Sequence, residues 1–205
     1  ADLDAVLLRS QELGFLGPGP VDRHVEHGRA LLAALPEGGR VLDLGSGGGL
    51  PGLVLARYRP ELDLTLLEAR QRPCRFLRDA VAELGLAAVV VVEARAEEAA
   101  RDPELRERFD TVMARSFGPP AVTAECAVGF LVPGGRLVVS EPPIEDGPAV
   151  PSPRWPAGGL DTLGLGPAVR GGEPGAGFVS LAKIRADDRW PRRVGIPAKR
   201  PLWTA

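Results

Sequence analysis

Short apolar segments alternate with helical stretches from residue 40 onward, and this alternation constrains the fold more than any other feature of the chain. Strands that alternate with helices form a parallel, doubly wound sheet with helices on both faces. We therefore predict an α/β fold, in which the unbroken valine run favours a strand buried on both sides. The predicted strands are Val41–Leu44, Leu64–Leu67, Val89–Val92, Thr111–Ala114 and Leu137–Val139. The predicted helices between them are Pro51–Tyr58, Arg72–Leu84, Ala96–Arg108 and Pro119–Leu131.

Two helical segments precede the alternating region. Apolar residues recur at helical spacing up to Gly14 and again between Val21 and Leu35. We predict that residues 1–39 form an N-terminal helical cap on a core of residues 40–205. Cap and core make one domain, because a chain of 205 residues is long enough to bury a single core.

The sequence changes character after the strand predicted at 137–139. Residues 142–177 are rich in proline and glycine, which predicts a loop of the kind that covers a substrate, with a strand near 160–165. A last strand is predicted at 178–184. The tail that follows is basic and also contains tryptophans, a pattern that fits either contact with RNA or a solvated chain end. The predicted RNA contacts are Arg192, Arg193, Lys199 and Arg200.

Composition narrows the classes of protein to consider. A formal net charge of -2 gives no general electrostatic reason to bind nucleic acid, so RNA contact requires a local basic surface. Cys74 and Cys126 are too few for a disulfide scaffold, which suits a reducing cytoplasm. No apolar run reaches the ~18 residues that a membrane span needs. His24 and His27 lack a third histidine or a cysteine beside them, so no metal site is predicted.

A glycine cluster follows the first predicted strand and contains most of the predicted chemistry. It reads Asp43-Leu44-Gly45-Ser46-Gly47-Gly48-Gly49-Leu50-Pro51-Gly52. Glycine lets the backbone turn sharply and lets a ligand approach where a Cβ would collide. The N–H groups at the start of the next helix then face that ligand. The cluster therefore predicts a loop that binds a nucleotide-type cofactor.

Two cofactors compete for this loop. The spacing Gly47-x-Gly49-x-x-Gly52 matches the dinucleotide fingerprint, and the same segment from Asp43 onward matches the S-adenosylmethionine (AdoMet) loop of methyltransferases. A carboxylate at Asp43 would repel a pyrophosphate but attract the ammonium and sulfonium of AdoMet. Glu68 ends the second predicted strand and suits the ribose hydroxyls of either cofactor. AdoMet is thus favoured, and a dinucleotide-dependent oxidoreductase stays the last alternative.

Two further strand ends belong to the same predicted pocket, because open parallel sheets bind ligands at the carboxyl ends of their strands. The segment Glu93–Glu97 follows the third strand, where a methyltransferase contacts adenine. The fourth strand leads into Arg115, which we expect to face the transferred methyl group. Arg115 is the one catalytic candidate.

Several segments along the chain together form a family pattern. They are Glu12–Pro18, the loop Gly45–Gly52, Arg95-Ala96-Glu97, Ala114-Arg115-Ser116-Phe117 and the tail Trp190–Leu202. On these segments the chain resembles, nearly end to end, the ribosomal RNA small subunit methyltransferase G family, also called glucose-inhibited division protein B. The resemblance implies a class I methyltransferase fold, Rossmann-like with a mostly parallel seven-stranded sheet.

The resemblance also implies a reaction, in which AdoMet methylates N7 of one guanine in small-subunit ribosomal RNA. The implied partner is that RNA or the ribosomal subunit, with no membrane, and the protein is expected to be a cytoplasmic monomer. The resemblance places AdoMet against Gly45, Leu50, Ala96, Glu97 and Arg115. The loop and strand-tip pattern adds Asp43, Ser46, Gly47, Gly49, Glu68 and Ala69.

This reaction agrees with the absence of an obvious general base near the predicted strand ends. Guanine N7 carries a free lone pair, so it attacks the sulfonium methyl without prior deprotonation. Alignment and a suitable electrostatic setting are then sufficient.

The chain departs from the family pattern at the end of its fifth strand. Family members usually have Lys-Gly there, whereas this chain has Ser140-Glu141. The exchange inverts a local charge and should weaken RNA binding. Two alternatives therefore stay open: a divergent paralogue that methylates a small molecule, and an AdoMet-binding protein without catalysis.

Overall fold

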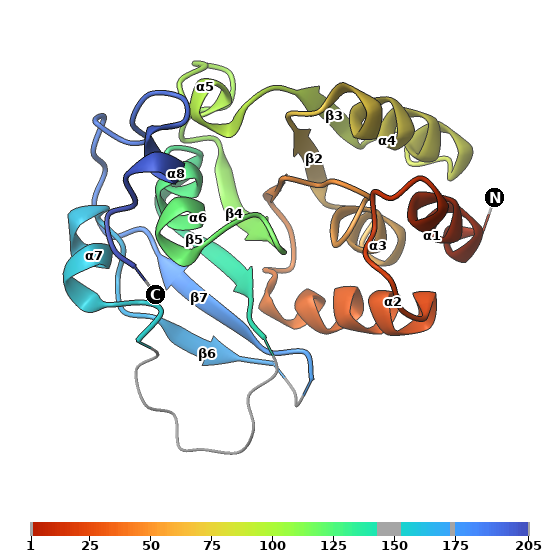
Figure 1. The fold of residues 1–205 in the computed structure, drawn as a ribbon, viewed down its shortest axis with the longest axis horizontal. Helices are drawn as coiled ribbons and strands as arrows, with labels where there is room; N and C mark the ends of the chain where they lie inside the picture. The colour runs from red at the N-terminus through yellow and green to blue at the C-terminus, as the bar shows by residue number, and fades with distance from the viewer. Residues whose placement is uncertain (1, 143–152, 173–174, 205) are drawn as a thin grey trace.

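A seven-stranded sheet forms the centre of the computed structural model, which describes residues 2–142, 153–172 and 175–204 (Figure 1). The strands are β1 (Arg40–Leu44), β2 (Asp63–Glu68), β3 (Val90–Glu93), β4 (Phe109–Ala114), β5 (Leu131–Ser140), β6 (Val169–Gly171) and β7 (Phe178–Ala182). Their order across the sheet is β3-β2-β1-β4-β5-β7-β6. Strands β1 to β5 run parallel, and β7 pairs antiparallel with both β5 and β6. The predicted parallel, doubly wound sheet is confirmed.

The strand order reverses beside β1, and this reversal locates the site. Asp43 of β1 lies opposite Leu66 of β2 on one side and opposite Met113 of β4 on the other. The chain extends the sheet from β1 toward β3 first, and then returns to add β4 and β5 on the opposite side. Open sheets bind ligands in the crevice at such a reversal, outside the carboxyl ends of the strands.

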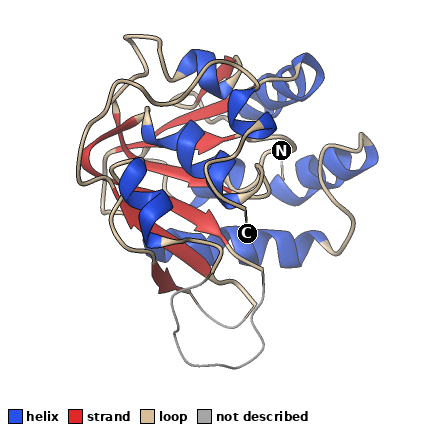
Figure 2. Ribbon diagram, turned by 60° about the vertical axis from the view of Figure 1, so that its left-hand side comes forward, coloured by secondary structure: helices blue, strands red, loops and turns tan. Residues whose placement is uncertain are grey.

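Helices cover both faces of the sheet (Figures 1 and 2). Leu7, Leu53 and Leu77 belong to the apolar core on one face, whereas Ala124 and Leu160 belong to the core on the other. Helices α1 (Leu3–Glu12), α2 (Val21–Ala30), α3 (Gly52–Tyr58), α4 (Gln71–Glu83) and the 3-10 turn η1 (Leu31–Ala34) supply the first face. The remaining helices are α5 (Ala96–Ala99), α6 (Pro120–Val128), α7 (Ala157–Thr162) and α8 (Ile196–Lys199).

None of the described helices is long and apolar enough to cross a membrane. The two predicted N-terminal helices exist as α1 and α2. They pack against each other and against α3, the helix that follows the glycine loop. Helices α1 and α2 therefore lie directly against the helix that follows the predicted cofactor loop.

The prediction that the valine run is buried on both sides is wrong. Strand β3 lies at one end of the sheet and pairs only with β2, so its outer edge is not covered by another strand. Val90 is 52% exposed. Local composition signals a strand, but the position of that strand in the sheet depends on pairing between distant segments.

Three predicted element boundaries also need correction. The helix predicted at 96–108 ends at Ala99 and is followed by turns, in which the N–H groups of Arg101 and Asp102 donate to the carbonyls of Glu98 and Ala99. Pro103 then prevents helical backbone from continuing, because it disfavours that conformation at Asp102. Helix α6 ends at Val128, where Gly129, a weak helix former, caps it and β5 begins soon afterwards. The strand predicted near 160–165 is helix α7, and the short edge strand β6 was not predicted. Residues 143–152 and 173–174 of the predicted loop at 142–177 lie outside the described residues.

Candidate cofactor and substrate site

Three cavities meet at the carboxyl ends of the parallel strands. We name them the loop cavity, the strand-tip cavity and the Trp155 cavity, with volumes of about 230, 430 and 380 Å³. The loop cavity is lined by Phe15, His24, Gly45, Ser46, Leu50 and Arg115, among others. The strand-tip cavity is lined by Gly45, Glu68, Ala69, Ala96 and Phe117, among others. The Trp155 cavity is lined by His27, Arg115, Phe117, Glu141 and Trp155, among others.

The chain that leaves β4 forms the wall that these cavities share. Ser116 borders all three cavities. Arg115 borders the loop and Trp155 cavities, and Phe117 borders the strand-tip and Trp155 cavities. Ser116 has a φ of 55°, in the left-handed region that residues other than glycine rarely adopt. Such backbone outliers cluster at functional sites. Because the three cavities share Ser116, a ligand in any one of them would lie next to the other two.

The glycine loop is tied to the tip of β2. The backbone N–H groups of Gly45 and Ser46 both donate to the carbonyl of Leu67, at 2.8 and 2.9 Å. Gly45 has a φ of 74°, and a Cβ there would lie 2.5 Å from Cδ2 of Phe117. Only glycine suits this backbone and this close approach. The sharp turn expected from the glycines is present, and these contacts explain its shape.

Asp43 lies beneath the loop rather than in a cavity. Its side chain is fully buried, and Oδ2 accepts a 3.0 Å hydrogen bond from the N–H of Gly52, the first residue of α3. Burial raises the pKa of Asp43 to about 7, although the bond from Gly52 and the charge of Arg115 act in the opposite direction. Asp43 therefore anchors the loop and the helix start, and its charge acts on the cavities from behind.

Glu68 faces the strand-tip cavity and organises its floor. Its Oε2 accepts the N–H of Gly47 at 3.0 Å, and its Oε1 accepts both the backbone N–H and Nε of Arg70, at 2.9 and 3.0 Å. The side chain is only 6% exposed, and that exposed part borders the cavity. Carboxylate oxygens have further acceptor capacity. Glu68 is therefore suited to accept hydrogen bonds from a pair of ribose hydroxyls.

Arg115 offers an unsatisfied donor to the site. One guanidinium nitrogen, Nη2, lies 3.0 Å from Nδ1 of His24. The other, Nη1, and Nε2 of His24 are buried and have no hydrogen-bond partner among the described residues. Burial lowers the pKa of Arg115 from its ordinary value. A ligand with a carboxylate, such as the methionyl end of AdoMet, would satisfy this donor.

The structure brings most predicted cofactor residues together, and it places three of them elsewhere. Asp43 lies below the loop, and Gly49 packs against Leu53. Glu97 accepts the N–H of Gly195 at 2.9 Å and so ties the tail to α5. Those that line the loop or strand-tip cavities are Gly45, Ser46, Gly47, Leu50, Glu68, Ala69, Ala96 and Arg115.

The Trp155 cavity contains side chains that were not among the predicted site residues. Nε1 of Trp155 donates to Oε1 of Glu141 at 3.1 Å, and Nε of Arg154 lies 3.2 Å from Oε2 of Glu141. His27 lies 2.8 Å from Oγ of Ser140, and burial, followed by the charge of Arg115, lowers its pKa. The unusual pair Ser140-Glu141 was the only signal in the sequence. Because Arg154 pairs with Glu141, the expected inversion of local charge is offset in part.

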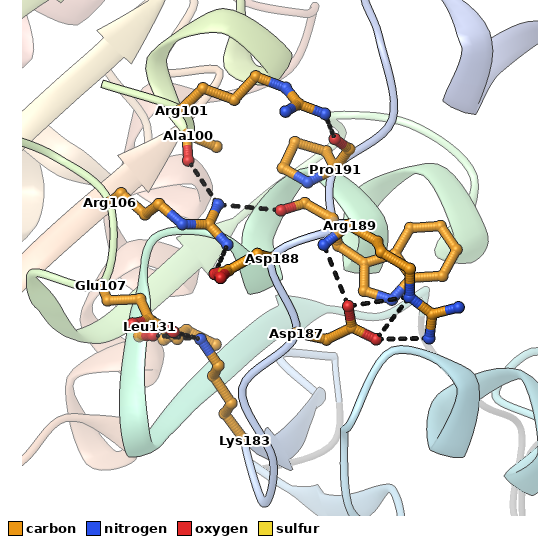
Figure 3. Close-up of polar contacts among 11 residues, drawn as sticks. Ala100, Arg101, Arg106, Glu107, Leu131, Lys183, Asp187, Asp188, Arg189 and Pro191 are labelled. Carbon is orange, nitrogen blue, oxygen red and sulfur yellow. Dashed lines mark hydrogen bonds and ion pairs between the residues drawn. The ribbon is translucent and has the colours of Figure 1, made fainter. Parts of the chain in front are cut away.

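The basic tail is fixed to the body of the protein (Figure 3). Nη1 of Arg106 donates to the carbonyls of Ala100 and Trp190, both at 3.0 Å, and Nη2 pairs with Asp188 at 3.1 Å. Arg101 donates to the carbonyl of Pro191. Among the predicted RNA contacts, Arg192 is held in an ion pair with a buried glutamate of α6. Arg193, Lys199 and Arg200 are exposed, without an ion pair to any described residue.

Comparison with known proteins gives consistent matches. The family model described as rRNA small subunit methyltransferase G matches residues 20–141. Curated proteins named ribosomal RNA small subunit methyltransferase G are similar over most of the chain. The protein of Moorella thermoacetica is 33% identical over 88% of this chain and 77% of its own. The protein of Rubrobacter xylanophilus is 39% identical over 84% of this chain and 68% of its own.

Solved structures agree at the level of the fold. A SAM dependent methyltransferase from Aquifex aeolicus has a TM-score of 0.59 at 17% identity, covering 87% of this chain and 98% of its own. The TYW2 protein of M. jannaschii, solved in complex with AdoMet, has a TM-score of 0.55 at 18% identity, covering 78% and 74%. The sheet and its helices therefore have the fold of these solved structures.

Proposed function

Because this chain belongs to the rRNA small subunit methyltransferase G family, we propose that it methylates N7 of a guanine in small-subunit ribosomal RNA. Its class is that of an AdoMet-dependent methyltransferase. The observation that carries the proposal is the junction at Ser116, where two cavities suited to AdoMet meet a third. A cofactor and an acceptor bound there would touch at the point of transfer.

The residues of the first two cavities fit the parts of AdoMet. In the strand-tip cavity, Glu68 would accept the ribose hydroxyls, and Ala69, Ala96 and Phe117 would contact the adenine. In the loop cavity, Arg115 would bind the methionyl carboxylate with the donor that otherwise lacks a partner. When bound, AdoMet supplies an activated methyl group on a sulfonium. The sulfonium would then lie between the two ends, near Gly45 and Ser116.

The third cavity would hold the base that accepts the methyl group. Its volume of about 380 Å³ lies in the range of small-molecule pockets, and Phe117 and Trp155 give it aromatic walls. Guanine N7 needs no general base because its lone pair is free. The work of this chain is then to bind, orient and exclude water, which accounts for large rate effects by itself.

The exposed cations of the tail support a role in RNA contact. Arg193, Lys199 and Arg200 lie within a few residues of one another and are not neutralised by described acidic groups. Fixed cations bind the phosphate backbone of RNA and release its counterions. A cytoplasmic location and a monomeric state, expected from the sequence, belong to the same proposal.

The direct test is methyl transfer to its expected substrate. Small ribosomal subunits from cells without the modification are incubated with labelled AdoMet, and the product is mapped by strand cleavage specific for N7-methylguanine. We expect label at one guanine of the small-subunit RNA. A Glu68→Gln variant serves as the matched control, since it keeps the shape of the strand tip but loses the carboxylate.

The alternatives predict different outcomes. If the protein binds AdoMet but leaves small subunits and their RNA unlabelled, the proposed substrate is wrong. A paralogue acting on small molecules would then transfer label to a cell metabolite fraction. A binding protein without catalysis would transfer none.

A further inference from the structure

One carboxylate in the Trp155 cavity is not among the residues that would contact AdoMet. Glu141 is only 5% exposed, and it borders this cavity at the end of β5. We propose that Glu141 accepts hydrogen bonds from N1–H and the 2-amino group of the target guanine. It thereby selects guanine and stabilises the positive charge that methylation at N7 creates. This inference rests on the proposed function.

The surroundings of Glu141 hold its carboxylate in one orientation. Trp155 donates to Oε1 at 3.1 Å, and Arg154 lies 3.2 Å from Oε2. Each carboxylate oxygen has two lone pairs. Among the described residues, this hydrogen bond and this ion pair hold the group in place and leave at least one acceptor position on each oxygen.

An acceptor-only group distinguishes guanine from the other bases. Guanine presents two adjacent donors, N1–H and the 2-amino group, on its Watson–Crick edge, and these match the two oxygens of a carboxylate. Adenine and cytosine present a ring acceptor beside their amino group, and uracil flanks its single N–H with carbonyls. A carboxylate facing any of those would leave lone pairs opposed, which costs binding free energy. Contact at this edge also leaves N7, on the other ring, free to face the Ser116 junction.

During methyl transfer, this carboxylate would stabilise the positive charge that develops on the guanine ring. The N7 lone pair forms a bond to the methyl carbon, the carbon–sulfur bond breaks, and its electron pair stays on sulfur as a neutral thioether. The positive charge passes to the guanine ring, and N1–H becomes a stronger donor. A hydrogen bond to a carboxylate therefore strengthens in the transition state, and this difference accelerates the step.

The charge of the cavity wall supports the same role. Arg115 and Arg154 both border the cavity, and Glu141 is the one carboxylate among its described lining residues. Without that carboxylate, a purine gaining positive charge would face two guanidinium groups. The opposing charge of Glu141 offsets this repulsion at short range.

The first arm of the test compares wild type with Glu141→Gln on unmodified small subunits. Glutamine keeps the shape but replaces one acceptor oxygen by a donor. We expect kcat/KM to fall by roughly 30-fold, mostly in kcat, while the Kd for AdoMet measured by calorimetry changes less than about 2-fold. Asp161→Asn on α7 is the charge control, since its carboxylate is exposed and we expect no change.

The second arm changes the RNA instead of the protein. Inosine at the methylated position lacks the 2-amino group and keeps N7. We expect wild type to be less active on the inosine RNA than on the guanine RNA. For Glu141→Gln, the change from guanine to inosine should lower activity little further, because the protein change and the RNA change remove the same contact.

The outcomes separate the two proposals. If wild type methylates no guanine N7, the proposed function fails. If wild type methylates N7 but uses inosine RNA as well as guanine RNA, the role of Glu141 is wrong. Equal kcat/KM for wild type and Glu141→Gln also overturns it. Should Glu141→Gln fail to fold, the inosine arm on wild type decides alone.

Discussion

Arg192 of the tail and Glu125 of α6 form a bidentate ion pair whose glutamate side chain is completely buried. Nε and the backbone N–H of Arg192 donate to Oε1 at 2.8 and 2.9 Å, and Nη2 donates to Oε2 at 2.6 Å. The same guanidinium also donates to the carbonyl of Arg200. Arg192 was predicted to contact RNA, and its contacts in the structure hold the tail in place.

Removing the guanidinium should destabilise the fold. Arg192→Ala leaves the carboxylate of Glu125 buried without its partner, and we expect the free energy of unfolding to fall by about 3 kcal/mol. Denaturant titration followed by circular dichroism measures this change. Arg193→Ala, the exposed neighbour, is the control and should change stability by less than about 0.5 kcal/mol. A double variant with methionine at 125 and 192 should lose less than Arg192→Ala does, because it buries no unpaired charge.

Glu68→Gln should weaken AdoMet binding. The variant loses an acceptor for the ribose hydroxyls and disturbs the bond from the N–H of Gly47, so we expect Kd to rise by about 10-fold to 100-fold. Calorimetry measures it directly. Glu93, its register partner at the tip of β3, pairs with Arg78 outside the cavity and provides the control, Glu93→Gln. Equal effects of the two substitutions would contradict the assigned role of Glu68.

The pH dependence of cofactor binding should report on Asp43. Its pKa is raised to about 7 by burial, so near neutral pH a substantial fraction of the protein carries it protonated. A bound sulfonium favours the carboxylate, which lowers this pKa and releases a proton. AdoMet affinity should therefore rise as pH increases from about 6 to 8.

Two comparisons isolate this effect. S-adenosylhomocysteine lacks the sulfonium charge, so its affinity should depend less on pH over the same range. Asp43→Asn should remove the difference between the two ligands. Equal slopes for both ligands on wild type would show that Asp43 does not sense the sulfonium.

A methyl group at Gly52 should disrupt the junction of loop and helix. A Cβ there would meet Cδ2 of Leu66 and lie 2.6 Å from Oδ2 of Asp43, both in the packed interior. We expect Gly52→Ala to lower the free energy of unfolding by about 1–3 kcal/mol. Gly38→Ala is matched to it, since no atom lies within 4 Å of its Cβ, and it should leave stability unchanged or slightly raised.

The tail cations should act on RNA through charge alone. Replacing Arg193, Lys199 and Arg200 together by alanine should weaken binding to small-subunit RNA and flatten its dependence on salt, by about 0.7 to 0.9 in log–log slope for each lost phosphate contact. Filter binding at several salt concentrations gives this slope. Arg57→Ala, an exposed cation near the end of α3 away from the loop, is the control. An unchanged slope in the triple variant would argue for a solvated tail.

Local sequence determined the elements that depend on neighbours along the chain. The apolar run before Asp43 and the glycines after it predicted β1 and a tight glycine loop, because glycine allows the positive φ that the backbone adopts at Gly45. Glu68 could be placed at the cavity because it ends a parallel strand, and such strands end at one edge of the sheet.

Only the tertiary structure decided which distant residues meet. The valine run became an edge strand because strand order depends on pairing, which the composition of one segment does not encode. Glu141 looked like an isolated charge until the fold brought Arg154 and Trp155 against it, and Arg192 looked free until Glu125 lay beneath it. The charge that a ligand meets depends on packing between segments far apart in the sequence, and electrostatic interaction depends on distance in space.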